Sequence, residues 1–266
     1  MQKLEIKGGK KISGSIKVSG SKNATLPILA STILTNKKVT LTNIPIVKDV
    51  ETMIDLLETL GSKIKLDKKK KKIEIENKKN LKTFASYNLL KTMRAGVLVL
   101  GPLLTKYGVA KVSLPGGCAI GSRPINLHLD ALKKMGAKIK IKEGYVIARA
   151  RKGLKGCSIK FGKVSVGATE NTLIAACLAE GKTILKNCAI EPEVQDLITF
   201  LKKIGCNIKW SGERQLSIIG TNNLIEALVI KIQFQEVSIV FSHQCDNHAK
   251  IINNIILNLN TCCAYK

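Results

Sequence analysis

Apolar residues recur at intervals of three and four positions in three separated stretches of the chain. The stretches read DVETMIDLLETLGSKIKLD, PINLHLDALKKMGAKIKIK and EVQDLITFLKKIGCNIKWS. This spacing predicts three helices, each with one buried face. A glycine follows each helix, and we expect it to adopt a left-handed conformation there: Gly61, Gly136 and Gly205. The glycines are 75 and 69 residues apart, which indicates a repeated structural unit.

Segments that alternate between apolar and polar residues follow each glycine and predict pairs of strands. The pairs are KIKLD with KIEIE, KIKIK with YVIAR, and NIKWS with QLSII. Another helix and strand precede each repeat helix, as in ATLPILASTIL with KKVTLTNIP. The unit is therefore strand, helix, strand, helix, strand, strand, and three units span about residues 14–220. Segments that are apolar round most of a helix, such as LLKTMRAGVLVLGPLL, must be buried. We predict an α/β fold with helices inside and sheets outside.

The net charge of +25 first suggests a nucleic acid or a membrane surface as partner. Only five of the 44 basic residues are arginines, and the lysines are spread over nearly every segment. We interpret them as a solvated surface, with the run Lys68–Lys72 in a hairpin turn. Aromatic residues make up 4% of the chain, which leaves few platforms for stacking bases. A basic nucleic-acid-binding protein stays an alternative that rests on charge alone.

The chain begins MQKLEIKGGKKISG, which lacks the apolar core of a signal peptide. No stretch approaches the roughly 18 apolar residues of a membrane span. We therefore expect a cytoplasmic protein without a membrane or nucleic-acid partner. The eight cysteines show no C-x-x-C spacing, so we expect most of them to be small core residues.

Two strand-to-helix junctions carry the first candidates for chemistry. GSKNATLPIL places Lys22 and Asn23 at a helix start, where backbone N–H groups and the helix dipole favour an anion. KVSVGATEN is the matching junction of the third unit, with Lys163, Ser165 and Val166 at its helix start. A solvent-exposed lysine beside an asparagine cap is the structural alternative at the first junction. Two such junctions on one face of the domain make a ligand cleft more plausible.

The loop LPGGCAIGSRP holds a cysteine and an arginine between a predicted strand and a predicted helix. Arg123 can bind a carboxylate or a phosphate through two parallel hydrogen bonds, and positive neighbours would change the acidity of the Cys118 thiol. An ordinary loop with an incidental cysteine is the alternative. His128 replaces an apolar residue of the middle repeat helix, and we expect a core or boundary histidine bonded to the backbone rather than a catalytic one.

Taken together, five blocks of the sequence resemble a known family. They are GSKNATLPILAS, KTMRAGVLVLGPL, SLPGGCAIGSRPINLHL, KVSVGATENTLIAACLAEG and EPEVQDL. In this order and spacing they are similar to the UDP-N-acetylglucosamine enolpyruvyl transferases, also called UDP-N-acetylglucosamine 1-carboxyvinyltransferases. The cysteine loop distinguishes these from their shikimate-pathway relatives.

The resemblance implies a fold and a reaction. The fold is a pair of inside-out α/β barrels of three units each, with the cleft between them. The reaction transfers enolpyruvyl from phosphoenolpyruvate to the 3-hydroxyl of UDP-N-acetylglucosamine and releases phosphate, the first committed step of peptidoglycan synthesis. It needs no cofactor and no metal. Its partners are these two small molecules, and the sequence identifies no partner chain.

The resemblance also implies roles for individual residues. Cys118 would donate the proton to the methylene carbon of phosphoenolpyruvate, and its loop would open and close over the substrates. Phosphoenolpyruvate would contact Lys22, Asn23 and Arg123. The residues implied for UDP-N-acetylglucosamine are Arg94, Arg123, Pro124, Ile125, Asn126, Leu127, Lys163, Val164, Ser165 and Val166.

The resemblance stops near residue 220, and so does the regular alternation of predicted strands and helices. Family members have a second barrel, which contributes an aspartate general base and arginines, and residues 1–21 would pair with it. We therefore expect three parts: a strand segment over 1–21, a barrel over 22–220, and an atypical, poorly ordered tail over 221–266. The tail is neutral and rich in Ile and Asn. We hypothesise that Asn222–Lys266 is out of frame on a truncated gene product.

Two alternatives concern what such a chain does. Within the tail, His243, Cys245 and His248 have a spacing that could bind zinc, with Cys262 and Cys263 nearby, although incidental residues of a disordered tail explain it as well. For the barrel, a binding domain that keeps UDP-sugar affinity without catalysis is the alternative to an enzyme, because half a cleft cannot exclude water.

Overall fold

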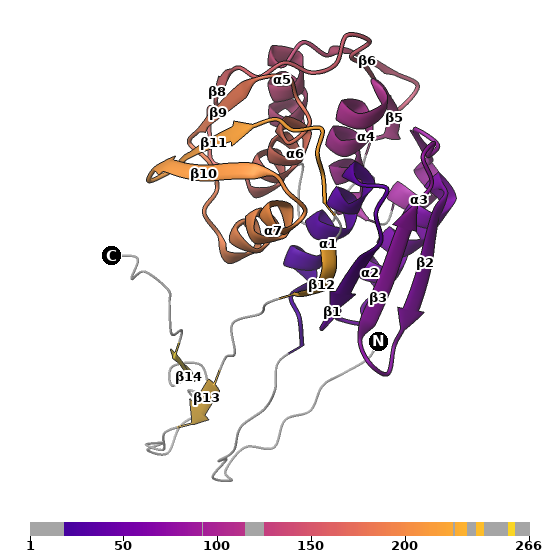
Figure 1. Cartoon of the computed structure of the whole chain (residues 1–266), viewed down its shortest axis with the longest axis vertical. Helices are drawn as coiled ribbons and strands as arrows, with labels where there is room; N and C mark the ends of the chain where they lie inside the picture. The colour runs from indigo at the N-terminus through magenta and orange to yellow at the C-terminus, as the bar shows by residue number, and fades with distance from the viewer. Residues whose placement is uncertain are drawn as a thin grey trace, which may run out of the picture. The chain divides into compact units, whose positions relative to one another are not determined.

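The computed structural model describes residues 19–91, 93–114, 125–225, 227–232, 238–241 and 255–258 (Figure 1). Contacts between residues divide the chain into two units. One is Gly20–Gln233, and the other combines Met1–Ser19 with Phe234–Lys266. Within the part of the chain that the structure describes, no helix is long and apolar enough to cross a membrane.

The unit Gly20–Gln233 contains three four-stranded sheets of the same design. The first has the order β12 (Ala227–Lys231), β1 (Val39–Thr42), β3 (Lys72–Asn77), β2 (Ser62–Asp67). The second has the order β4 (Phe84–Ala85), β5 (Val109–Ser113), β7 (Tyr145–Arg149), β6 (Lys138–Lys142). The third has the order β8 (Ser158–Lys160), β9 (Lys182–Lys186), β11 (Gln215–Ile219), β10 (Asn207–Gly212). In each sheet the first strand named is parallel to its neighbour and the other pairs are antiparallel.

The helices lie between these sheets, as Figure 1 shows for α1, α4 and α6. They are α1 (Lys22–Ser31), η1 (Thr32–Leu34), α2 (Lys48–Leu60), α3 (Tyr87–Leu90), η2 (Arg94–Val99), α4 (Leu100–Tyr107), α5 (Asn126–Lys134), α6 (Val166–Ala176) and α7 (Pro192–Lys203). One face of each sheet packs on them: in β3, Ile73 and Ile75 are buried while Glu74 and Glu76 are not. The predicted α/β class, with helices inside and sheets outside, is confirmed.

The repeat helices end as the sequence predicts. Gly61, Gly136 and Gly205 have φ angles of 111°, 97° and 100°, in the left-handed region. After α5 the Gly136 N–H donates to the Lys133 carbonyl and the next N–H to the Leu132 carbonyl, so the last carbonyls of the helix are satisfied. All three predicted strand pairs follow. Of the lysine run, residues 68–71 form the turn between β2 and β3, and Lys72 begins β3.

In the segment LLKTMRAGVLVLGPLL, residues 96–104 are buried as predicted, but the segment does not form one helix. It is divided among α3, the 3₁₀-helix η2 and α4. Pro102 has no N–H to donate to the Leu98 carbonyl, so an α-helical hydrogen-bond ladder cannot run back through residue 98. The tighter 3₁₀ pattern fills that turn.

Strand β12 lies beyond residue 220, the boundary expected for the barrel. It pairs with β1, and the Ile232 N–H donates to the Thr42 carbonyl at 3.0 Å. The Asn43 side-chain amide donates back to the Ile232 carbonyl at 3.1 Å. Ile230 and Ile232 are buried. The apolar residues that begin the compositional change therefore complete the first sheet.

The second unit has a small described part. Strand β13 (Ser238–Phe241) pairs antiparallel with β14 (Ile255–Asn258). The histidines and cysteines of the zinc alternative lie outside the described residues. Elsewhere, Cys177, Cys188 and Cys206 are buried and reduced, as expected of core residues.

Candidate functional site

A cavity of about 710 Å³ lies where the first turns of the helices meet. Residues from the starts of α1, α2, η2, α5, α6 and α7 line it, so their positive dipole ends point toward one space. Its described lining is Lys22, Asn23, Leu26, Pro27, Asp49, Met93, Arg94, Ala95, Val97, Leu98, Ile125, Leu127, His128, Lys163, Val164, Ser165, Val166, Gly167, Glu170 and Glu193. Converging N-termini with Lys22, Arg94 and Lys163 favour an anionic ligand.

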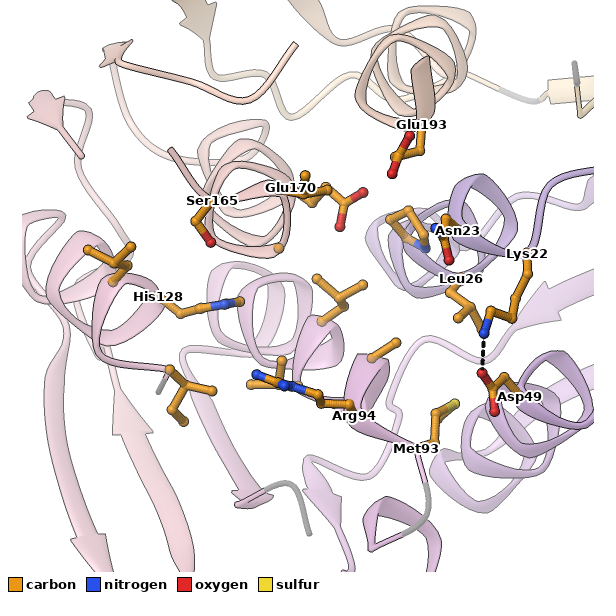
Figure 2. Close-up of a pocket in the computed structure, with 18 of the residues that line it drawn as sticks. Lys22, Asn23, Leu26, Asp49, Met93, Arg94, His128, Ser165, Glu170 and Glu193 are labelled. Carbon is orange, nitrogen blue, oxygen red and sulfur yellow. Dashed lines mark hydrogen bonds and ion pairs between the residues drawn. The ribbon is translucent and has the colours of Figure 1, made fainter. Parts of the chain in front are cut away.

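On one side of the cavity, the chain enters α1 through Gly20 and Ser21. A Cβ on Gly20 would lie 2.0 Å from the Asn43 carbonyl oxygen, so this close approach requires glycine. The Ser21 hydroxyl accepts from the Ala24 N–H at 3.3 Å and caps the helix. Lys22 Nζ lies 2.8 Å from Asp49 Oδ2 of α2, and Figure 2 shows this pair at the edge of the cavity. Both side chains are exposed enough for an incoming anion to compete with Asp49.

On the other side, α6 begins in the same way. Ser165 is its N-cap, and the hydroxyl accepts from the Ala168 N–H at 3.4 Å. Lys163 and Val164 precede it and are exposed. The side chain of His128, from α5, lies beside Gly167 in the first turn of α6. A Cβ at Gly167 would sit 3.2 Å from His128 Cε1, so the glycine leaves room for the imidazole ring.

Asn171, also of α6, determines which ring nitrogen of neutral His128 carries the proton. The amide oxygen of Asn171 accepts from the Gly101 N–H at 2.8 Å, and its nitrogen donates to the Val97 carbonyl at 3.1 Å. These two backbone partners determine which end of the amide is nitrogen. That nitrogen is 3.1 Å from His128 Nδ1, which must therefore accept, so the proton of the neutral ring is on Nε2. The expected histidine is buried, but its partner is this side chain rather than the backbone.

Electrostatics keep His128 neutral. Burial, with a smaller contribution from the Arg94 guanidinium, lowers its pKa to about 4. Figure 2 shows the Arg94 side chain extending toward His128. The imidazole can therefore donate a hydrogen bond from Nε2 at neutral pH, but it carries no charge.

Acidic residues complete the cavity. Glu170 of α6 is 4% exposed, and within the described chain no hydrogen-bond partner reaches its Oε1. Burial, then the nearby Glu193 and Glu191 carboxylates, raise its pKa to about 8. Glu191 and Glu193 themselves occupy the N-cap and first turn of α7, where the helix dipole favours negative charge. Glu170 is in the second turn of its helix and has no such explanation.

The structure brings together most of the site residues expected from the sequence. Nine of them line the cavity: Lys22, Asn23, Arg94, Ile125, Leu127, Lys163, Val164, Ser165 and Val166. Asn126 is exposed at the start of α5 and does not line it. Cys118, Arg123 and Pro124 lie outside the described residues.

Sequence reasoning gave no cavity role to Asp49, Glu170 and Glu193, and it treated His128 as structural. One signal was available for Glu170. In VGATENTLIAACLA, a glutamate stands in a helix that is otherwise almost entirely apolar or small. A carboxyl group in such a position is buried, and a buried carboxyl needs a reason.

The three-sheet barrel and its anion-attracting cavity define one half of an enolpyruvyl-transferase fold. The solved structures similar to this chain have that fold. The enolpyruvyl transferase NikO from Streptomyces tendae matches 85% of the chain and 53% of its own, with a TM-score of 0.74 and 20% identity. EPSP synthase from Acinetobacter baumannii matches 85% of the chain and 51% of its own, with a TM-score of 0.68 and 19% identity.

The sequence comparisons place the chain more narrowly. The model of the family EPSP synthase (3-phosphoshikimate 1-carboxyvinyltransferase) matches residues 6–232, and the chain belongs to this family. Its curated relatives include the UDP-N-acetylglucosamine 1-carboxyvinyltransferases of Pelagibacter ubique, 64% identical over 226 residues, and Sulfurovum sp., 52% identical over 224. These matches cover 85% and 84% of the chain but 54% and 53% of the relatives. The chain thus spans about half the length of the curated relatives it matches.

Proposed function

We propose that this chain is the substrate-binding half of a UDP-N-acetylglucosamine 1-carboxyvinyltransferase. Its reaction would transfer enolpyruvyl from phosphoenolpyruvate to the sugar nucleotide in the cytoplasm and release phosphate, as a step of peptidoglycan synthesis. One observation carries the proposal: helix starts converge on a cavity that also holds Lys22, Arg94 and Lys163. Both substrates are anions. The similarity to enzymes of this name supports the choice of substrates.

The two sides of the cavity suit the two substrates. Lys22 and Asn23 at the start of α1 would hold phosphoenolpyruvate, with Lys22 leaving Asp49 for the stronger charge of a phosphate. Arg94, Ile125, Leu127 and the Lys163–Val166 junction would hold the sugar nucleotide, and His128 could donate from Nε2. By the family resemblance, Arg123 would bind both anions, Pro124 and Asn126 would contact the sugar nucleotide, and Cys118 would supply the proton.

The chemistry would proceed as an addition and an elimination. The Cys118 thiol gives its proton to the methylene carbon of phosphoenolpyruvate, and the cation-like centre at C2 is attacked by the sugar 3-hydroxyl. In this addition the hydroxyl loses its proton to a base. Removal of a proton from the new methyl group, together with expulsion of phosphate from C2, then regenerates the carbon–carbon double bond on the product. The chain spans half the length of its relatives, so binding without turnover is the second candidate function.

Two measurements on the purified 266-residue chain test this. Isothermal titration calorimetry with UDP-N-acetylglucosamine is expected to show binding that weakens at least tenfold in Arg94→Met. Phosphate release is then measured with both substrates, with Cys118→Ser as the control. Release that depends on Cys118 identifies an enzyme, and binding without release identifies a binding half. No binding by the unaltered chain would contradict both.

A further inference from the structure

Glu170 lines the cavity, but the proposed function assigns it no role. Its carboxyl group is buried in the second turn of α6, and its Oε1 finds no hydrogen-bond partner among the described residues. A buried carboxyl oxygen without a partner lowers stability, because its interaction with water is lost and nothing replaces it. The residue at such a position is expected to find its partner in a ligand.

The neighbouring polar groups of α6 differ from Glu170 in this respect. The Thr169 hydroxyl accepts from the Ala189 N–H at 3.1 Å, and Asn171 uses both ends of its amide. Both residues therefore hold the fold together. The Thr172 hydroxyl is also buried without a described partner, but Thr172 does not line the cavity. Glu170 alone among these four combines an unpartnered buried oxygen with a place in the cavity wall.

The position of Glu170 indicates which part of a ligand it would meet. Figure 2 shows its carboxyl group between Ser165, on the side of α6 and His128, and Asn23, on the side of α1. A sugar nucleotide bound along Arg94, His128 and Ser165 has to present its sugar toward Lys22, where the second substrate would lie. The sugar then passes Glu170.

We infer that Glu170 binds the hexosamine part of the sugar nucleotide, exchanging hydrogen bonds with a hydroxyl or amide group of the sugar. This inference rests on the proposed function. It makes Glu170 a specificity residue, because the unpartnered oxygen is satisfied by a ligand that carries the sugar and left buried by one that lacks it.

The form of Glu170 that binds is the neutral acid, which can both donate and accept. Glu191 and Glu193 act against its ionisation, and an ionised Glu170 would also repel the diphosphate of the ligand. The other charged or titratable groups that line the cavity are Lys22, Asp49, Arg94, His128 and Lys163. Affinity for the sugar nucleotide is therefore expected to fall as the pH rises past about 8, the pKa of Glu170.

The experiment compares two ligands, UDP-N-acetylglucosamine and UDP, on the whole chain by calorimetry at pH 7 and pH 9. Glu170→Met keeps the length of the side chain and removes its hydrogen bonds. This variant is expected to weaken the binding of UDP-N-acetylglucosamine about tenfold and the binding of UDP less than twofold. Glu170→Gln, which imitates the neutral acid, is expected to stay within about threefold at pH 7 and to lose the decline at pH 9. Glu180→Gln, at an exposed surface position that does not line the cavity, is the matched control and should preserve the preference for the sugar.

The outcomes separate two failures. If the unaltered chain binds neither ligand, the proposed function is wrong and the assignment of Glu170 is lost with it. If the unaltered chain binds UDP-N-acetylglucosamine but Glu170→Met does not change its affinity relative to UDP, only the assignment is wrong. An equal loss for both ligands in a variant with unchanged circular dichroism would also overturn it, because the residue would then act on the shape of the cavity alone.

Discussion

Helices α1 and α6 occupy equivalent places in the first and third repeats, yet they are specialised in opposite ways. Each begins at a serine cap, is buried along most of its length and opens onto the cavity. Helix α1 presents Lys22, an exposed cation balanced by Asp49. Helix α6 carries polar groups in its buried second turn: Glu170, whose Oε1 has no described partner, and Asn171, which has several. The two repeats therefore share the same helix position. They differ in that α1 places a charged side chain at the edge of the cavity, whereas α6 places polar side chains in its buried wall.

The largest effect is expected from Asn171→Leu in the wall of α6. It would leave the Gly101 N–H and the Val97 carbonyl buried without partners and free His128 Nδ1. We expect the free energy of unfolding, measured with urea, to fall by about 3–4 kcal/mol. Asn126→Leu, at the exposed start of α5, is the control and should change it by less than about 0.5 kcal/mol. A loss below about 1 kcal/mol for Asn171 would show that the two helices are not so different.

Glu170 gives the next effect, visible in the dependence of stability on pH. The folded chain keeps a proton on Glu170 up to pH about 8, whereas the unfolded chain releases it near 4.5. The folded state binds more protons between these values, so the free energy of unfolding falls as pH rises through that interval.

Glu170→Gln cannot ionise and should remove a fall of about 3–4 kcal/mol between pH 5 and pH 9. Thermal unfolding across that range measures it. Glu180→Gln, at an exposed surface position, should keep the fall. A parallel pH dependence in Glu170→Gln and the unaltered chain would mean that Glu170 is ionised in the folded state.

The two serine caps should contribute alike, because both hydroxyls accept at similar distances. Ser21→Ala and Ser165→Ala are each expected to cost about 0.5–1 kcal/mol in urea unfolding, and the double variant should show the sum. A clear inequality between them would indicate that the helix starts differ already at their caps, before Lys22 or Glu170 contributes.

The smallest effect on stability is expected from a substitution in the Lys22–Asp49 pair at the edge of the cavity. The Lys22–Asp49 pair is exposed, so Asp49→Asn should change the free energy of unfolding by less than about 0.5 kcal/mol. The same change releases Lys22, and we expect phosphoenolpyruvate to bind about two- to threefold more tightly at low salt. Titration followed by phosphorus NMR measures this, with Lys22→Met as the variant that should weaken binding. Unchanged affinity in Asp49→Asn would mean that Asp49 does not compete with the ligand.

The sequence predicted those features that depend on local pattern. Gly61, Gly136 and Gly205 identified the repeat because a helix end with a left-handed glycine is determined by a few neighbouring residues. The paired strands followed from alternation for the same reason. The capped helix starts that hold Lys22 and Ser165 were also local motifs, and the structure places both in one cavity.

The features that the sequence did not predict depend on residues far apart in the chain. Strand β12 carries no signal that identifies β1 as its partner, since their paired residues are 188 or 189 positions apart. The amide of Asn171 reaches His128 across 43 positions, so the histidine's partner could not be predicted from its own helix. The acids Asp49 and Glu193 looked like ordinary first-turn residues, and only the fold brings them to the cavity.

Strand β12 also has a consequence for how the chain is made. In the first sheet it fills the place that β4 and β8 fill in the other two, but the ribosome synthesises it after every other strand of the three sheets. Until then, β1 presents a row of unpaired backbone groups, which is the kind of edge on which nascent chains associate wrongly. The closing contact is also among the most distant in sequence, and such contacts form slowly. A nascent chain interrupted just before residue 227 would contain all three repeats and still depend on chaperones to protect its open edge.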